Sequence, residues 1–306
     1  MRILGGICAA GLVLAACGGP ASQAPETDQA ESAVSPAPEA DAPATVEQVE
    51  LHRLDCGTIE VSDLDIFATD GSFAGQSDTF TNSCWLVRHP EGDLIWDLGL
   101  PGILAGGGEQ AQGVFTVSMD QTLTAQLEAR GISMDEIELV SISHSHFDHV
   151  GQIDQVRGAR WLVHEKEYNL MFPPATPETE GESGSQFAAF EGFEREVFTG
   201  EYDVFGDGSV VIFETPGHTP GHTALQVTLE NVGPVLLTGD LWHRSESREG
   251  RKVPRFNADV EGAEGEPGAL TLASMEAFEA RAEELDAMVV IQHEPADVNV
   301  LPDVLR

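Results

Sequence analysis

Four side chains that can bind a metal ion stand within six residues of this chain. Segment 144–149 reads His-Ser-His-Phe-Asp-His. Three imidazoles and one carboxylate offer the mixed nitrogen and oxygen ligands that suit zinc, manganese, iron or cobalt. The alternative is a polar loop whose histidines only cap and hydrogen-bond. A lone histidine would favour that alternative, but this spacing favours a metal site.

The motif directly follows the apolar run 139–142, which predicts a buried strand. A helix is predicted over 121–130, with Asp120 as its N-cap and Gly131 as its stop. The motif therefore forms the loop at the carboxyl end of the strand predicted at 139–142. In open α/β sheets such loops commonly bind ligands.

Other strand-like runs also end in residues that can bind metal. Each has its own acid or histidine: the hairpin 84–96 ends at Asp97, strand 210–214 leads to two Pro-Gly-His units at His218 and His222, strand 235–237 leads to Asp240, and strand 288–291 leads to His293. Further strands are predicted at Ile59–Ile66, 161–163 and 224–229, and a helix at 272–286. These elements bring polar loops to several strand ends.

The ordered motifs resemble the metallo-β-lactamase superfamily. They are His-x-His-x-Asp-His at 144–149, Gly-His at 218, Thr-Gly-Asp at 240 and a late His293, and they extend over the whole folded region. The resemblance implies an α/β fold, a four-layered αβ/βα sandwich with two central mixed β-sheets flanked by helices. It also implies two divalent metal ions as cofactors, zinc in the first place and otherwise cobalt, manganese or iron.

By motif position, the resemblance implies two groups of ligands that share one residue: His144, His146 and His218 for the first metal, Asp148, His149 and His293 for the second, and Asp240 as the bridge. Two adjacent divalent ions lower the pKa of a shared water, so that a bridging hydroxide exists at neutral pH and can attack an ester. Asp148 would also act in catalysis, by orienting that hydroxide or carrying its proton. Asp97 would hydrogen-bond one of the metal ligands without itself binding a metal. The alternative is that Asp97 is an ordinary acidic residue in a turn.

The bridging aspartate, Asp240, limits which subfamilies of this superfamily the chain can resemble. Metallo-β-lactamases proper lack it, which argues against antibiotic hydrolysis, and export and charge disfavour the thioesterases and nucleases that keep it. Segments 54–59, 84–88, 95–101 and 146–152 resemble the N-acyl homoserine lactonases, which open the lactone ring of quorum signals. The substrate expected is therefore a small-molecule lactone or ester. The first alternative is an enzyme of the same fold that hydrolyses phosphotriesters or general esters. The second alternative is a non-catalytic metal-binding lipoprotein.

One residue departs from the lactonase pattern. Members of that group carry a tyrosine three residues after the bridging aspartate, where this chain has His243. His243 would donate the same hydrogen bond to the lactone or protonate the leaving alkoxide; the alternative is a structural histidine beside Arg244. The neighbouring Trp242, and Phe147 within the motif, are predicted to line the substrate pocket.

An insertion at 165–205 is predicted to form a lid. It carries aromatic residues among prolines, glycines and acids, and Phe172 and Phe187 are predicted to line a slot for an acyl chain. The alternative is that these rings only attach the insertion to the body of the domain.

The charge of the chain excludes some partners. It has 52 acidic residues against 15 Lys and Arg, a formal net charge of −37. Nucleic acids and anionic membrane surfaces would be repelled at moderate salt, so no nucleic acid partner is expected.

The N-terminal region predicts export. Residues 1–17 resemble a bacterial lipoprotein signal in which Cys17 is lipidated, and 18–50 form a disordered, acidic, Ala/Pro-rich tether. Residues 51–306 are then one hydrolase domain, held by this lipid at the periplasmic or outer-membrane side of a bacterial envelope. Cys56 and Cys84 form a disulfide or remain two buried thiols.

Overall fold

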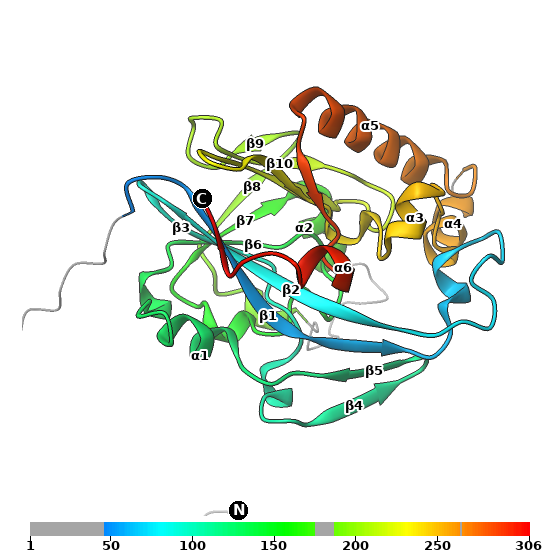
Figure 1. The fold of residues 1–306 in the computed structure, drawn as a ribbon, viewed down its shortest axis with the longest axis horizontal. Coiled ribbons are helices and arrows are strands. Elements are labelled where there is room, and N and C mark those ends of the chain that lie inside the picture. The colour runs from blue at the N-terminus through cyan, green and yellow to red at the C-terminus, as the bar shows by residue number, and fades with distance from the viewer. Residues whose placement is uncertain (1–45, 175–186, 264) are drawn as a thin grey trace, which may run out of the picture. The chain divides into compact units, whose positions relative to one another are not determined.

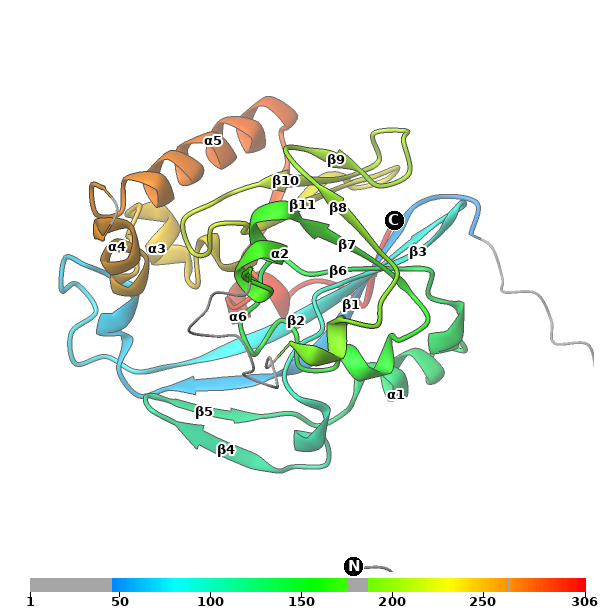
Figure 2. The same cartoon turned by 180° about the vertical axis from the view of Figure 1, so that it is seen from behind.

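The computed structural model describes residues 46–174, 187–263 and 265–306, which belong to one compact unit (Figures 1 and 2). Cys17, the predicted signal segment and nearly all of the predicted tether lie outside these residues. Within the described part of the chain, none of the helices has both the length and the apolar character needed to cross a membrane.

The larger sheet is mixed and has nine strands in the order β4-β5-β1-β2-β3-β6-β7-β8, with β14 beside β1. Its members are β1 (Glu50–Val61), β2 (Asp78–His89), β3 (Gly92–Trp96), β4 (Glu109–Gln112), β5 (Phe115–Ser118), β6 (Leu139–Ser141), β7 (Arg160–His164), β8 (Arg195–Phe198) and β14 (Val304–Leu305). Strands β3, β6, β7 and β8 run parallel, and the other pairs are antiparallel.

The smaller sheet has five strands in the order β13-β12-β11-β10-β9. They are β9 (Tyr202–Asp203), β10 (Val210–Glu214), β11 (Thr223–Leu229), β12 (Gly233–Leu237) and β13 (Met288–Val290). The helices are α1 (Leu123–Glu128), α2 (Glu165–Met171), α3 (Ser245–Glu249), α4 (Arg255–Gly262), α5 (Ala269–Leu285) and α6 (Pro295–Val298). Short 3₁₀ turns include η1 (Leu64–Phe67), η2 (Gly102–Leu104), η3 (Met134–Glu136), η4 (Ile153–Gln155), η5 (Ala188–Phe190) and η6 (Gly239–Leu241).

Three buried clusters hold the layers together. Alternate residues of β2 face opposite ways: Trp85 and Val87 pack against the smaller sheet, while Leu86 packs toward α1 and α2. Helix α5 covers the outer face of the smaller sheet (Figure 1). Its residues Met275 and Phe278 are buried in the cluster between the helix and that sheet. The layers are thus helix, sheet, sheet and helix, which confirms the predicted αβ/βα sandwich.

Most predicted elements differ from the structure at one or both ends, and for two of them a side-chain hydrogen bond explains the difference. The strand predicted at Ile59–Ile66 already ends at Val61, because the Asp63 side chain accepts the backbone N–H of Asp65 at 3.1 Å and starts η1. Helix α1 begins after Thr122 rather than Asp120, since the Thr122 hydroxyl accepts the N–H of Ala125.

The predicted lid is, where described, part of the domain body. Within 165–205 the chain forms α2, η5, β8 and β9, and β8 extends the larger sheet alongside β7. Residues 175–186 of this insertion lie outside the described residues. The described part therefore builds the core rather than closing over a site.

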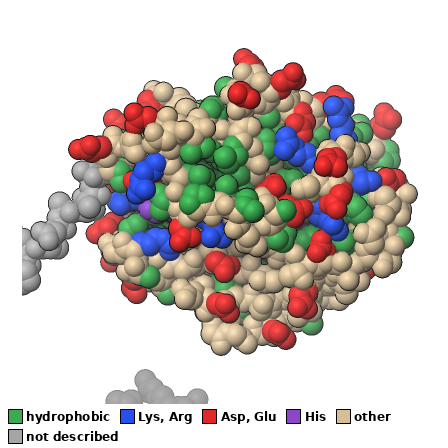
Figure 3. Space-filling model, viewed as in Figure 1, with side chains coloured by type: hydrophobic (Ala, Val, Ile, Leu, Met, Phe, Trp, Pro, Cys, Tyr) green, Lys and Arg blue, Asp and Glu red, His purple; other side chains and the backbone are tan. Residues whose placement is uncertain are grey.

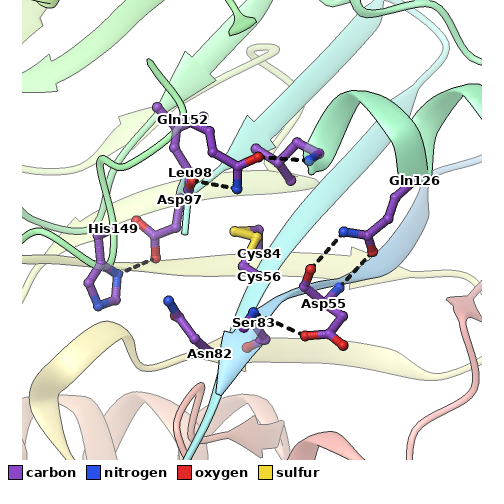
Figure 4. The surroundings of a disulfide bond; sticks show 12 residues. Asp55, Cys56, Asn82, Ser83, Cys84, Asp97, Leu98, Gln126, His149 and Gln152 are labelled. Atoms are coloured by element: carbon purple, nitrogen blue, oxygen red, sulfur yellow. Dashed lines mark hydrogen bonds and ion pairs between the residues drawn. A yellow bond between two sulfur atoms is a disulfide. The ribbon is translucent and has the colours of Figure 1, made fainter. Parts of the chain in front are cut away.

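Cys56 and Cys84 are joined by a disulfide between β1 and β2, with Cα atoms 5.7 Å apart and both residues fully buried. It packs beneath the turn that carries Asp97 (Figure 4). Gly99 in this turn has φ 62°, and a Cβ there would lie 2.4 Å from the Cβ of Cys56. Only glycine fits this close approach, so the disulfide supports the Asp97 turn directly.

Replacing both cysteines by alanine should destabilise the protein. The bond closes a loop of 28 residues, and losing that constraint on the unfolded chain costs about 3–4 kcal/mol. Chemical denaturation of the oxidised wild type and of the double variant measures this loss. Two reactive thiols in the denatured, unreduced wild type, or an unchanged free energy of unfolding, would contradict the bond.

Candidate metal centre

The structure brings the seven predicted metal ligands together in two groups that share Asp240. The ligand atoms of each group lie within 4.8 Å of one another: His144, His146, His218 and Asp240 in the first group, and Asp148, His149, Asp240 and His293 in the second. In the first group, His218 Nε2 lies 3.1 Å from His144 Nε2 and 2.8 Å from His146 Nδ1. Three imidazoles thus converge on one point.

The ligands come from the ends of strands in both sheets. His144 to His149 follow β6 of the larger sheet, while His218, Asp240 and His293 follow β10, β12 and β13 of the smaller one. Gly239, with φ 53°, makes the turn into Asp240, and a Cβ there would lie 2.7 Å from His222 Nε2. The two sheets therefore meet at the edge where the loops converge.

Asp97 connects three parts of the centre. Its Oδ1 accepts the N–H of Ser143 at 2.6 Å, and its Oδ2 accepts the amide of Gln292 at 2.8 Å. The same Oδ2 lies 3.0 Å from Nδ1 of His149, and Figure 4 shows this contact to the left of the disulfide. The buried carboxylate orients His149 and joins the loops that follow β3, β6 and β13.

Other ligands are also held through the nitrogen or backbone group that faces away from the centre. Nδ1 of His218 lies 3.2 Å from Oδ1 of Asn257, and Nδ1 of His293 lies 2.8 Å from the carbonyl oxygen of Thr81. The backbone N–H of Asp240 donates to Nε2 of His222 at 2.9 Å.

The ring of His222 is fixed by its surroundings. Its Nδ1 lies 3.0 Å from the carbonyl oxygen of Thr215, which can only accept, so this nitrogen carries the proton. Burial lowers the pKa of His222 to about 3, which keeps the ring neutral. The sequence marks His222 through the second Pro-Gly-His unit, but it assigns a supporting role neither to His222 nor to Gln292.

The buried polar atoms at the centre fit a bound cation. His149 Nε2, His293 Nε2 and Asp240 Oδ1 are buried without a hydrogen-bond partner. Yet the two nitrogens lie only 3.1 Å and 3.0 Å from that oxygen. Buried polar atoms rarely remain unsatisfied, and a metal ion between these three would satisfy them all.

The electrostatics of the centre agree with this fit. Burial lowers the pKa of His146 to about 3 and holds the pKa of His144 well below its ordinary value, so both rings offer free lone pairs at neutral pH. Burial also acts to lower the pKa of His149 and His293, but the nearby carboxylates, Asp240 first, raise it overall. The carboxylates thus draw positive charge to this point, as they would a metal ion.

A cavity of about 590 Å³ opens onto the two groups. Metal-ligand side chains line part of it, as do His243 and Phe147. The rest of its lining is largely apolar and comprises Ile59, Ile66, Phe67, Phe80, Phe115, Pro254 and Phe256, with Arg255, Asn257 and Asp259 beside them. Most of this wall comes from β1, η1, β2, β5 and α4, none of which the sequence linked to the substrate.

Three predicted pocket residues lie elsewhere. Trp242 is 1% exposed and packs edge-to-face on Phe278 of α5, because the backbone after η6 turns the indole into the outer core. Phe172 lies 6.4 Å, centroid to centroid, from Trp161, and Phe187 packs in the same cluster. The prediction that Trp242, Phe172 and Phe187 line the pocket is therefore wrong, and the two phenylalanines attach the insertion to the core.

The metallo-beta-lactamase superfamily model matches residues 78–293. Among curated proteins, N-acyl homoserine lactonase AttM of Rhizobium radiobacter is 29% identical over 81% of this chain and 94% of its own length. AttM of Azorhizobium caulinodans is 30% identical over 69% of this chain and 81% of its own length.

Solved structures share the fold. A crystal structure of an N-acyl homoserine lactone hydrolase with N-hexanoyl-L-homoserine at its catalytic metal centre has a TM-score of 0.68 at 21% identity, over 85% of this chain and 98% of that one. The dizinc quorum-quenching lactonase AidC has a TM-score of 0.55 at 18% identity, over 83% and 91%. The family model, the relatives and the converging histidines agree, and the chain belongs to the metallo-β-lactamase superfamily.

Proposed function

We propose that this protein is a metal-dependent hydrolase that opens the ring of N-acyl homoserine lactones and so quenches quorum signals. The observation that carries the proposal is the apolar cavity that opens directly onto two His/Asp groups sharing Asp240. The relatives named N-acyl homoserine lactonases support it.

The cavity and the surface both suit a neutral substrate with an apolar tail. The polar lactone would sit at the His/Asp groups, and the acyl chain would lie against rings such as Phe67, Phe80 and Phe256. Figure 3 shows acidic side chains spread over the visible face, as expected for a chain with net charge −37. Such a surface repels nucleic acid but not an uncharged lactone.

Two divalent ions, which we propose to be zinc, would be held by the two ligand groups. When bound, they supply a hydroxide at neutral pH and polarise the ester carbonyl. Ring opening adds water across the ester C–O bond, so one water proton must reach the departing ring oxygen. Asp148 lines the cavity with a buried carboxylate and is the residue that we assign to carry this proton.

His243 has a different role from the tyrosine that it replaces. Its Nε2 lies 3.1 Å from Oδ2 of Asp240, and its ring packs on Phe67 with centroids 4.4 Å apart. A carboxylate only accepts, and burial lowers the pKa of His243, so a neutral ring donates from Nε2 and has no proton on Nδ1. We therefore assign His243 to holding Asp240 rather than to donating to the substrate.

We also propose that the protein is exported and lipid-anchored through Cys17. The support is the sequence of residues 1–17, with an apolar stretch that ends in Leu-Ala-Ala before this cysteine. An anchored hydrolase on the outer side of a membrane would meet diffusible signals before they enter the cell.

The proposed activity is tested with a panel of acyl homoserine lactones, thioesters and aryl phosphotriesters on metal-replete protein. We expect lactones to be the preferred substrates. Since changing even an outer partner of a metal ligand costs roughly 10–100-fold, Asp240→Asn should lower lactonase activity more than about 100-fold. Asp286→Asn, at the exposed C-cap of α5, is the control and should match wild type. Intact lactones alongside rapid hydrolysis of another ester would overturn the substrate assignment.

The acyl-chain wall is tested by Phe256→Ala. Losing this ring should lower kcat/KM for long-chain lactones roughly tenfold, which corresponds to about 1.4 kcal/mol of lost transition-state binding. The effect on short-chain lactones should be smaller. Phe172→Ala, whose ring packs on Trp161 away from the cavity, is the matched control. A change in chain-length preference with Phe172→Ala and none with Phe256→Ala would reverse this assignment.

The anchor is tested by labelling expressing cells with a fatty acid and separating membrane from soluble fractions. Wild-type protein should be labelled and membrane-bound, whereas Cys17→Ser should lose the label. Cys8→Ser, in the same apolar stretch, should keep it. Equal labelling of wild type and Cys17→Ser would exclude lipidation at this residue.

A further inference from the structure

Glu167 of α2 lies between the two loops that carry the histidines of the first ligand group. Its Oε1 accepts the backbone N–H of Ser145 at 2.7 Å, and Ser145 stands between His144 and His146. Its Oε2 accepts the hydroxyl of Thr219 at 2.7 Å and the N–H of Gly221 at 3.2 Å, just after His218. One carboxylate therefore joins the two loops.

The surroundings of Glu167 offer its carboxylate hydrogen-bond donors. The residue is 1% exposed, and all three of its partners donate. Among the described residues, no ion pair reaches it. A buried carboxylate costs free energy unless its oxygens are hydrogen-bonded, and these three donors satisfy both oxygens.

The contact between α2 and the second loop is also close. A Cβ at Gly221 would lie 2.1 Å from the backbone nitrogen of Glu167, so only glycine lets the loop approach the helix this closely. The neighbouring acid Glu165 on the same helix is exposed. The carboxylate of Glu167 is thus built into the fold, whereas that of Glu165 is not.

We propose that Glu167 is a positioning residue that clamps the 144–149 and 218–222 loops together and so prepares the first ligand group for its metal ion. The proposal rests on the two-metal centre of the proposed function, but not on a lactone as substrate. The second group has other supports, since Asp97 holds His149 and Thr81 holds His293. The effect of Glu167 should therefore be selective for the first group.

Glu167→Gln keeps the shape of the side chain and changes the hydrogen bonds. The amide has one oxygen that accepts and one NH₂ that donates, so at least one backbone N–H of the two loops faces another donor. Glu165→Gln removes the same charge from the exposed side of α2 and is the matched control.

The zinc affinities of the two ligand groups are measured separately in two histidine variants, by competition with a chelator. His293→Ala impairs the second group and His218→Ala impairs the first. We expect Glu167→Gln to weaken zinc binding roughly 10–100-fold in the His293→Ala background and to leave it unchanged in the His218→Ala background. Glu165→Gln should change neither affinity.

Thr219→Val provides a second test that keeps the carboxylate and removes a single donor. Thr219→Val should lower the zinc affinity less than Glu167→Gln does, and again only in the His293→Ala background. If metal-free Glu167→Gln shows no cooperative thermal unfolding, the zinc affinity of Thr219→Val tests the clamp in its place. Equal losses in the two backgrounds, or no loss at all, would overturn the clamp. The zinc-affinity measurement uses no substrate, so a failure to hydrolyse lactones would not change its outcome. Wild-type protein that binds fewer than two zinc ions would refute the two-metal centre.

Discussion

The carboxylate of Asp240 is buried among five imidazole rings, those of His144, His149, His218, His243 and His293. Burial acts to raise its pKa, but the surrounding histidines, His293 and His149 foremost, hold it well below the ordinary value. An ionised, acceptor-only group at this point needs positive charge around it. The proposed two-metal assignment fits this need, because one oxygen faces each ligand group.

The fold serves this one carboxylate from several directions. Both sheets end their strands at the same edge, and a set of buried hydrogen bonds then fixes the loops: His222 holds the backbone of Asp240, Asp97 holds His149, and Glu167 joins the loops of the first group. The disulfide packs closely against Gly99 and so supports the Asp97 turn. Figure 4 shows the disulfide below Asp97 and Leu98. A centre held this way needs little rearrangement to bind its ions.

The sequence could predict the fold class and the ligands because short ordered motifs carry the resemblance to the metallo-β-lactamase superfamily, and that resemblance implies both. Apolar runs followed by histidine or aspartate placed His144, Asp240 and His293 at strand ends, and strand 210–214 has the predicted bounds. The supporting residues could not be predicted in this way. Gln292 meets Asp97 across a sequence separation of 195 residues, and no local feature marks such a pair.

Most of the cavity wall, apart from Phe147, was missed for a related reason. Aromatic residues in a loop-rich insertion look alike whether they face the core or a cavity, and Phe172 faces the core. Phe67 and Phe256, which do line the cavity, lie on short elements whose facing depends on packing across the whole domain.

A crystal structure of zinc-replete protein, with anomalous scattering recorded at the zinc edge, tests directly whether two ions share Asp240. Two anomalous peaks are expected, one within each His/Asp group and both in contact with Asp240. A single peak, or a second peak away from Asp240, would contradict a centre in which Asp240 is shared by two ions.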